Sequence, residues 1–310
     1  RRGLHALRER LAAAGYQEVI NFTFVEPQWE SDFAGEPNPV RLLNPIASQQ
    51  SVMRTSLIGS LVANIRYNQA RKLERIRVFE VGRAFLRDPQ AADGPLSVAG
   101  VRQPMRIAAA AYGPASAEQW ATTSADKARL ADFFDLKGDL ESLASPLEVR
   151  TQPAAHPAFH PGRSARVLLG ARPAGWIGEL HPRWQHKYEL PHPPVLFELD
   201  AEALQDLPMP APEVPSKYPP VVRDISAFVP AGLAVQGILD ALLVAKPAIV
   251  TTINLFDMYQ GEHVPKGSKS LAFRVVMQHT ERTLTDAEAD GARDDLVTLL
   301  SQQFSATLRT

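Results

Sequence analysis

The side chains best suited to chemistry lie at outward positions of three strands expected in the last third of the chain. In each strand apolar residues occupy the alternate positions and are expected to face a buried layer. The outward set contains two aromatic rings, one guanidinium and two amides: Phe228, Asn254, Phe256, Arg274 and Gln278. Aromatic rings and Arg stack on unpaired bases, and amides hydrogen-bond base edges. This combination predicts a surface that binds single-stranded RNA, unless another domain buries the rings.

Two lysines beside a glycine-containing loop extend this candidate surface. Lys266 and Lys269 lie between the second and third of these strands, where we expect them to contact an RNA backbone. Residues 217–283 carry seven Lys or Arg and five Asp or Glu, a net charge of +2. Such a charge attracts nucleic acid only weakly. The surface therefore suits an RNA loop that belongs to a larger RNA bound through additional contacts.

A pair of histidines has the spacing of a metal site. His156 and His160 are four residues apart, which on a helix would place both imidazoles on one face. Pro157 and Pro161 interrupt any helix there. The chain has no Cys, which excludes thiolate catalysis, disulfides and Cys-ligated zinc. We therefore expect a loop around these histidines and no metal site.

The overall composition excludes several classes of protein. The chain has 33 Lys and Arg against 34 Asp and Glu, so any basic surface must be local. Its hydrophobic fraction of 45 % excludes a wholly disordered chain. No run of about 18 apolar residues predicts a membrane-spanning helix. The sequence also lacks a Gly-x-Ser-x-Gly motif, a Walker loop and a dinucleotide fingerprint.

Proline divides the chain into two expected domains. Nine of its 26 prolines lie between Pro191 and Pro220, where they disfavour both helices and central strands. We expect a first domain at 1–206, a Pro-rich linker at 207–215 and a second domain at 216–310. The second domain's elements are expected, in the order strand, helix, strand, strand, helix, strand, at 223–229, 235–244, 250–259, 270–279, 285–304 and 305–309. This β-α-β-β-α-β order is ferredoxin-like, and such a sheet can leave one face open.

The first domain mixes helices and strands without regular alternation. Apolar spacing predicts helices at 4–15, 55–72 and 126–144, the second capped by Thr55. Alternation predicts strands at 18–25, 75–86, 105–112, 164–169, 174–180 and 195–200. Because strands and helices do not alternate one by one, a parallel sheet is disfavoured. The predicted class is α+β, with a mostly antiparallel sheet flanked by helices.

Short motifs follow one another in a characteristic order along the whole chain. In the first domain they occupy residues 15–24, 43–45, 53–57, 67–69, 78–82, 135–141 and 178–182, and in the second 218–220, 223–226, 255–259, 269–271 and 282–284. Together they resemble the class II synthetase-like domain and the ferredoxin-fold anticodon-binding domain of bacterial phenylalanine–tRNA ligase beta subunits. The motifs do not include those of the family's N-terminal portion, with its tRNA-binding, editing and further helical domains. We therefore expect this chain to be a fragment of a longer protein.

The resemblance also indicates where a class II active site would lie. Such a site needs an Arg two residues before a strand Glu, then a loop, and later an Arg at a glycine-rich junction. The candidate Glu80 is preceded at that position by Val78, which cannot bind phosphate. Residues 82–85 follow at once, so we expect no room for an ATP loop, and no Arg directly follows the glycines of 175–178. We expect no catalytic residue here, with Glu80 and Arg83 only lining the sheet.

The resemblance implies a role within an α2β2 tetramer in the cytoplasm, with no membrane contact. An alpha subunit would attach phenylalanine to tRNA-Phe with ATP and Mg²⁺, while this chain, without a cofactor of its own, supplies a scaffold and an anticodon-recognition domain. We expect an extensive apolar surface on the first domain for the alpha subunit. Tyr218 and Arg223, near one edge of the second domain's sheet, complete the candidate RNA-binding residues. The alternative is a non-catalytic RNA-binding or assembly protein of the same architecture.

Overall fold

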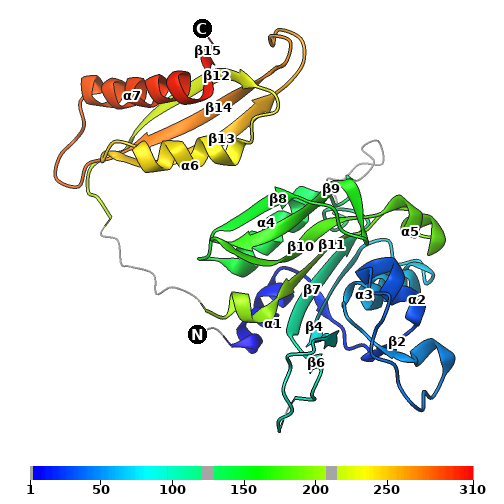
Figure 1. Cartoon of the computed structure of the whole chain (residues 1–310). Coiled ribbons are helices and arrows are strands. Elements are labelled where there is room, and N and C mark those ends of the chain that lie inside the picture. Colours follow the sequence, from blue (N-terminus) through cyan, green and yellow to red (C-terminus); the bar gives the residue numbers. More distant parts are fainter. Residues whose placement is uncertain (1–2, 96, 120–128, 207–214, 310) are drawn as a thin grey trace. The chain divides into compact units, whose positions relative to one another are not determined.

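The computed structural model describes residues 3–95, 97–119, 129–206 and 215–309. The chain forms two compact units, residues 1–210 and 211–310 (Figure 1). The Pro-rich linker expected at 207–215 lies, except for Pro215, outside the described residues.

A seven-stranded sheet forms the centre of the first unit (Figure 1). Its strands, in spatial order, are β1 (Gln17–Glu18), β4 (Ile76–Arg83), β7 (Met105–Tyr112), β11 (Val195–Asp200), β10 (Arg172–Leu180), β9 (Phe159–Leu169) and β8 (Val149–Pro153). The pairing of β1 with β4 is parallel, and the other five pairings are antiparallel. The α+β class and the mostly antiparallel sheet predicted from the sequence are confirmed.

Helices pack on both faces of this sheet. On one face α1 (Leu4–Ala13) and α4 (Phe133–Ala144) bury leucines against alternate strand residues, among them Phe79. On the other face α3 (Ile58–Gln69) packs against Val78 and its neighbours, and its expected apolar stripe is fully buried. The smaller elements are β2 (Phe24–Val25), α2 (Pro27–Trp29), η1 (Glu30–Ala34), η2 (Ser48–Gln50), β3 (Val52–Met53), β5 (Leu86–Arg87), β6 (Val101–Arg102), α5 (Pro182–Lys187) and η3 (Ala201–Leu204).

The single strand expected at 18–25 is wrong. Only its two ends pair, as β1 and β2, and the residues between them are irregular. Asn21 turns toward the sheet and donates from Nδ2 to Glu80 Oε2 at 2.8 Å. As a result the neighbouring Ile20 and Phe22 are 93 % and 72 % exposed.

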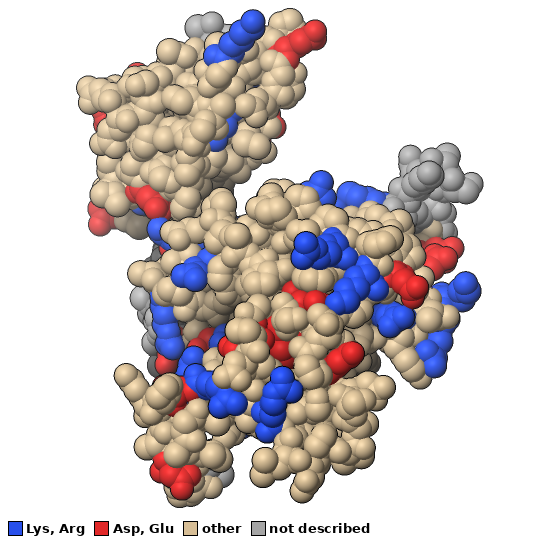
Figure 2. Space-filling view, turned by 45° about the vertical axis from the view of Figure 1, so that its right-hand side comes forward, with Lys and Arg blue, Asp and Glu red and all other residues tan. Residues whose placement is uncertain are grey.

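Charged side chains of both signs are interspersed over the first unit. Figure 2 shows Lys and Arg on much of the visible face of this unit, with Asp and Glu among them. Several are paired, including Arg163 with Glu179 at 2.8 Å and Lys187 with Asp32 at 2.5 Å. The visible side of the second unit is mostly uncharged.

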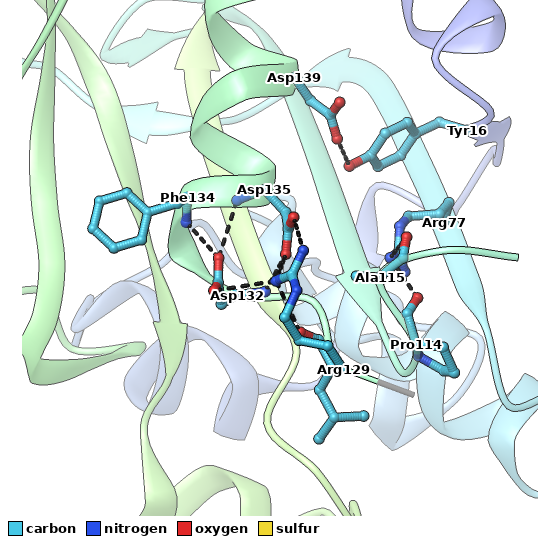
Figure 3. A network of polar contacts seen from close by, with 10 residues as sticks. Tyr16, Arg77, Pro114, Ala115, Arg129, Asp132, Phe134, Asp135 and Asp139 are labelled. Carbon is cyan, nitrogen blue, oxygen red and sulfur yellow. Dashed lines mark hydrogen bonds and ion pairs between the residues drawn. The ribbon is translucent and has the colours of Figure 1, made fainter. Parts of the chain in front are cut away.

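Helix α4 begins later than the apolar spacing indicated. Its N-cap is Asp132, whose carboxylate accepts hydrogen bonds from the backbone N–H groups of Phe134 and Asp135 (Figure 3). Asp135 in turn accepts from the Asp132 N–H. Arg129 donates two hydrogen bonds of 2.7 Å to Asp135 and thereby lowers the pKa of that carboxyl to about 2. Residues 129–132 therefore precede the helix, and 126–128 lie outside the described residues.

The second unit has the expected β-α-β-β-α-β order. Its elements are β12 (Val221–Pro230), α6 (Val235–Ala245), β13 (Val250–Tyr259), β14 (Ser268–Met277), α7 (Asp286–Phe304) and β15 (Thr307–Leu308). The sheet is antiparallel with the order β13-β14-β12-β15, and both helices lie on one face (Figure 1). Inward side chains such as Ile225, Phe273 and Leu296 form its core. This arrangement confirms the ferredoxin-like fold.

Candidate nucleic-acid interface

Strand register arranges the side chains of the uncovered sheet face in three rows. One row consists of Asp224, Arg274 and Asn254, the next of Ser226, Ala272 and Asp257, and the third of Phe228, Ser270 and Tyr259. The outer rows lie four residues apart, which is about 13 Å along a strand. The Asp224–Arg274 pair therefore lies at one end of the face and the rings of Phe228 and Tyr259 lie at the other. Ser226, Ala272 and Asp257 lie between these two ends.

Arg274 is the centre of the first row. Its Nε and Nη2 donate to the two carboxylate oxygens of Asp224, each at 2.9 Å. Its Cζ lies 4.8 Å from the ring centroid of Phe256, a cation–π contact. The ring is 50 % exposed, so the guanidinium and the ring together form an accessible surface. The hydrogen bonds from Arg274 lower the pKa of the Asp224 carboxyl, which stays ionised.

A β-bulge in β13 determines which residues reach this face. The register shifts between Leu255 and Asp257, which leaves Phe256 as the extra residue. Beyond the bulge the alternation is inverted, so Tyr259 lies opposite Ser270 on the uncovered face and is 46 % exposed. Strict alternation from Ile253 would have turned Tyr259 inward. Sequence reasoning missed this tyrosine because nothing in the pattern of the strand marks the bulge.

The other predicted residues on this side of the sheet have distinct environments. Asn254 is exposed beside Arg274, and Phe228 is half-buried in the third row. Lys266 is exposed on the loop between β13 and β14. Gln278 directly follows β14, and its Nε2 donates to the Tyr218 carbonyl oxygen at 2.6 Å. This bond links the segment before β12 to the residue after β14, and it occupies the side-chain amide of Gln278.

Two predicted residues do not lie on the uncovered face. Arg223 is on the helix side of β12, where Nε donates to Asp290 at 2.9 Å and Nη2 to Asp286 at 2.7 Å. Lys269 lies within β14 rather than on the loop, is only 9 % exposed, and donates from Nζ to the Leu233 carbonyl oxygen. Arg223 and Lys269 occupy the same alternate positions as the inward-facing core residues of their strands. Their side chains therefore point away from the uncovered face, contrary to the expectation that they bind RNA there.

In the first unit, the positions that correspond to an ATP site are filled by core contacts. Val78 is buried, and Glu80 is 3 % exposed. The Glu80 carboxylate accepts from Arg54 Nη1 at 2.7 Å and from Asn21 Nδ2 at 2.8 Å. Arg54, itself buried, also donates from Nε to the Arg83 carbonyl oxygen at 3.0 Å. The carboxylate is therefore a structural group inside the sheet.

The expectation that residues 82–85 leave no room for a loop after Glu80 is wrong. β4 and β7 pair as antiparallel neighbours, and residues 84–104 connect them, including the short hairpin of β5 and β6. Gly82 lies near the end of β4, and a Cβ atom at this position would lie 2.2 Å from Arg54 Nη2. Glycine is needed there because the buried guanidinium occupies the space of a side chain.

The paired histidines have structural roles. His156 lies in a loop with its ring centroid 4.9 Å from those of Phe159 and Trp176, and burial lowers its pKa to about 4. His160 is not in a loop but in β9, and its Nδ1 accepts from the Gly162 N–H at 3.0 Å. Within the described part of the chain, no group of three His, Cys, Asp or Glu residues is placed to hold a metal ion.

Two family patterns match the chain in order. Residues 1–201 match the family described as phenylalanyl tRNA synthetase beta chain CLM domain, and residues 216–309 match the ferredoxin-fold anticodon binding domain. The first match alone covers about two thirds of the chain. The chain therefore belongs to the phenylalanyl-tRNA synthetase beta chain family.

Curated relatives agree with this assignment. The phenylalanine–tRNA ligase beta subunit of Burkholderia pseudomallei (strain K96243) is 49 % identical over 318 residues, which cover 100 % of this chain and 39 % of the relative. The beta subunit of Ralstonia nicotianae is 48 % identical with the same coverage, and that of Dechloromonas aromatica is 48 % identical over 100 % of this chain and 38 % of its own. The chain thus spans about two fifths of the length of these relatives.

In the ranges that the structure describes, no helix is both long and apolar enough to cross a membrane.

Proposed function

We propose that this chain forms the C-terminal part of a phenylalanine–tRNA ligase beta subunit. In that role it assembles with an alpha subunit, as an α2β2 tetramer in the cytoplasm, and the tetramer attaches phenylalanine to tRNA-Phe with ATP and Mg²⁺. The first unit is a non-catalytic scaffold, and the second recognises the tRNA anticodon. The identity of 48–49 % to named beta subunits over the whole chain supports this function over a separate RNA-binding or assembly protein.

The observation that carries the anticodon proposal is the chemistry of the uncovered face of the second unit. Phe228, Phe256 and Tyr259 offer aromatic surface, and Arg274 and Asn254 offer hydrogen-bond donors. Stacking on such rings contributes about 1–3 kcal/mol per base and tolerates any base, whereas hydrogen bonds to base edges discriminate. A loop with unstacked bases, such as an anticodon, matches this chemistry better than a duplex does.

Exposed apolar residues of the first unit support a contact with the alpha subunit. Ile20 and Phe22 stand out from the irregular segment between β1 and β2, and Leu43 and Ile46 are 97 % and 93 % exposed. Leu43, Ile46 and the partly buried Phe24 line one shallow hollow. Large apolar side chains exposed together are uncommon on free proteins and typical of permanent interfaces.

The test is assembly with the alpha subunit encoded by the same genome. Leu43→Ser and Ile46→Ser, placed in the full-length beta subunit, should reduce co-elution with the alpha subunit and lower aminoacylation of tRNA-Phe in proportion. Val244→Ser is the matched control, because Val244 is 89 % exposed but lies on α6 of the second unit. Normal assembly of the double variant would contradict the proposed interface. Failure of the native pair to charge tRNA-Phe would contradict the proposed function as a whole.

A further inference from the structure

The hydrogen bonds of Arg274 leave a defined part of its guanidinium for a ligand. An arginine has five N–H donors, and the paired contacts with Asp224 use one on Nε and one on Nη2. Both Nη1 hydrogens and one on Nη2 make no hydrogen bond within the described residues. The side chain is 50 % exposed, so these donors are open to solvent. Arg274 is therefore held in one orientation and still able to bind.

The charges around Arg274 indicate what it binds. The Asp224 carboxylate neutralises the guanidinium at 2.9 Å, and the carboxylate of Asp257 belongs to the adjacent row of the same face. A phosphate that approached Arg274 would meet these two anions as well as the cation. A neutral base meets no such repulsion, and it can stack on the guanidinium or accept its remaining hydrogens.

Phe256 supplies the second part of the same surface. Its ring is held 4.8 Å from the guanidinium by the bulge of β13, whereas the carboxylate partner comes from β12 on the opposite side of β14. Three strands thus fix one composite group. Other Arg side chains also contact both oxygens of a carboxylate, namely Arg129 with Asp135, Arg163 with Glu179 and Arg282 with Glu288. None of these three arginines has a ring within cation–π distance among the described residues.

We propose that Asp224, Arg274 and Phe256 form the binding site for one unpaired base of an RNA loop, rather than a contact with its phosphate backbone. Arg274 and Phe256 touch the base, and Asp224 is a positioning residue that fixes the guanidinium and cancels its attraction for phosphate. This inference rests on the proposed anticodon recognition by the second unit and identifies the residues that select a base there.

The experiment measures binding of RNA hairpins to the full chain. The probes are a hairpin with the anticodon arm of tRNA-Phe and hairpins in which one loop base is changed, each tested by fluorescence anisotropy at several salt concentrations. The variants are Asp224→Asn and the double variant Asp224→Asn with Arg274→Gln, which preserves the net charge. The control is Arg163→Gln with Glu179→Gln, and thermal unfolding checks that all variants fold.

The proposal predicts a different result for each variant. The double variant should lose about tenfold in affinity for the cognate hairpin and much of its preference over the changed hairpins, with the salt slope unchanged. Asp224→Asn alone should also lose preference, but it should bind every hairpin with a salt slope steeper by about one, because it exposes the charge of Arg274. The control should behave like the native chain.

Three results would overturn the inference, and they are distinguishable. If the native chain prefers the cognate hairpin and the double variant keeps that preference, the base site is elsewhere while anticodon recognition stands. If Asp224→Asn leaves the salt slope unchanged, Asp224 does not cancel an attraction for phosphate. If instead the native chain binds all hairpins equally, the proposed function of the second unit fails together with this inference.

Discussion

Glu30 is the buried carboxylate whose protonation we expect to control the stability of the first unit. It lies in η1 and is 2 % exposed. Its Oε2 accepts hydrogen bonds from the backbone N–H of Thr55, at 2.9 Å, and from the Thr55 hydroxyl. Burial raises the pKa of Glu30 from its ordinary 4.5 to about 7; the bonds from Thr55 oppose this rise, and the charges of Glu198 and Glu36 add to it. Because Thr55 is engaged here, it does not cap α3, whose N-cap is Leu57.

The sign of the pH effect follows from which state loses its proton first. In the unfolded chain Glu30 ionises near pH 4.5, whereas in the folded chain it keeps its proton to about pH 7. Its contribution to stability is therefore complete below about pH 4.5 and is lost as the pH rises through about 7. At about 1.4 kcal/mol per pKa unit, the total loss is about 3 kcal/mol, of which about 2.5 kcal/mol falls between pH 5 and pH 8.

Urea unfolding of native chain and Glu30→Gln at these two pH values measures the effect. Glutamine fills the same space and still accepts a hydrogen bond but cannot ionise. From pH 5 to pH 8 the free energy of unfolding of the native chain should fall by about 2.5 kcal/mol relative to that of the variant. Glu9→Gln, on the exposed side of α1, should match the native chain. If native chain and Glu30→Gln show the same pH dependence, Glu30 has an ordinary pKa and the reasoning is refuted.

Three further predictions follow from the other contacts. Arg54→Met should destabilise the first unit by about 3–5 kcal/mol in urea unfolding, because it leaves Glu80 charged and buried; adding Glu80→Gln should restore part of the loss, and an additive double variant would refute the pairing. The chain alone should show no phenylalanine-dependent ATP–pyrophosphate exchange, and Val78→Arg should not create it, because residue 78 is buried in the core; exchange by the purified chain would contradict this. In the assembled ligase, Phe256→Ala should weaken binding of the cognate tRNA and reduce discrimination against anticodon variants, because the ring holds the base against the hydrogen-bond donors of Arg274. Lys266→Ala should instead weaken all tRNAs alike and lower the salt slope by about one. Equal discrimination by native and Phe256→Ala enzymes would contradict the stacking role.

Most of the second unit could be predicted because its local signals agree with its packing. β13 has the expected bounds, and α7 begins directly after Thr285, whose hydroxyl and the Glu288 carboxylate form a capping box. Inward residues at every second position placed Asn254 and Arg274 correctly on the uncovered face. These features depend only on neighbours along the chain, which a sequence displays directly.

The errors come from contacts between residues distant in the sequence. Asn21 leaves the expected strand because it bonds to Glu80, 59 residues later. Arg223 is expected at an RNA-binding edge of the sheet, but its two carboxylate partners, 63 and 67 residues later, hold it against α7. The bond between Asp224 and Arg274, which defines the base site we propose, spans 50 residues and has no local signature. Periodicity predicts a face, but only the fold shows which charges on it cancel.

This cancellation explains how a nearly neutral unit can serve RNA recognition. Arg223, Arg274, Arg282 and Arg293 are all paired with carboxylates of the same unit, and Lys269 is buried. A surface of this kind attracts RNA weakly from a distance, because counterion release requires cations that are free to meet phosphates. Its contribution must then come from stacking and from hydrogen bonds to bases at contact. We therefore expect the uncovered face to select among anticodons of tRNAs that other parts of the ligase already hold, and to contribute more to discrimination than to affinity.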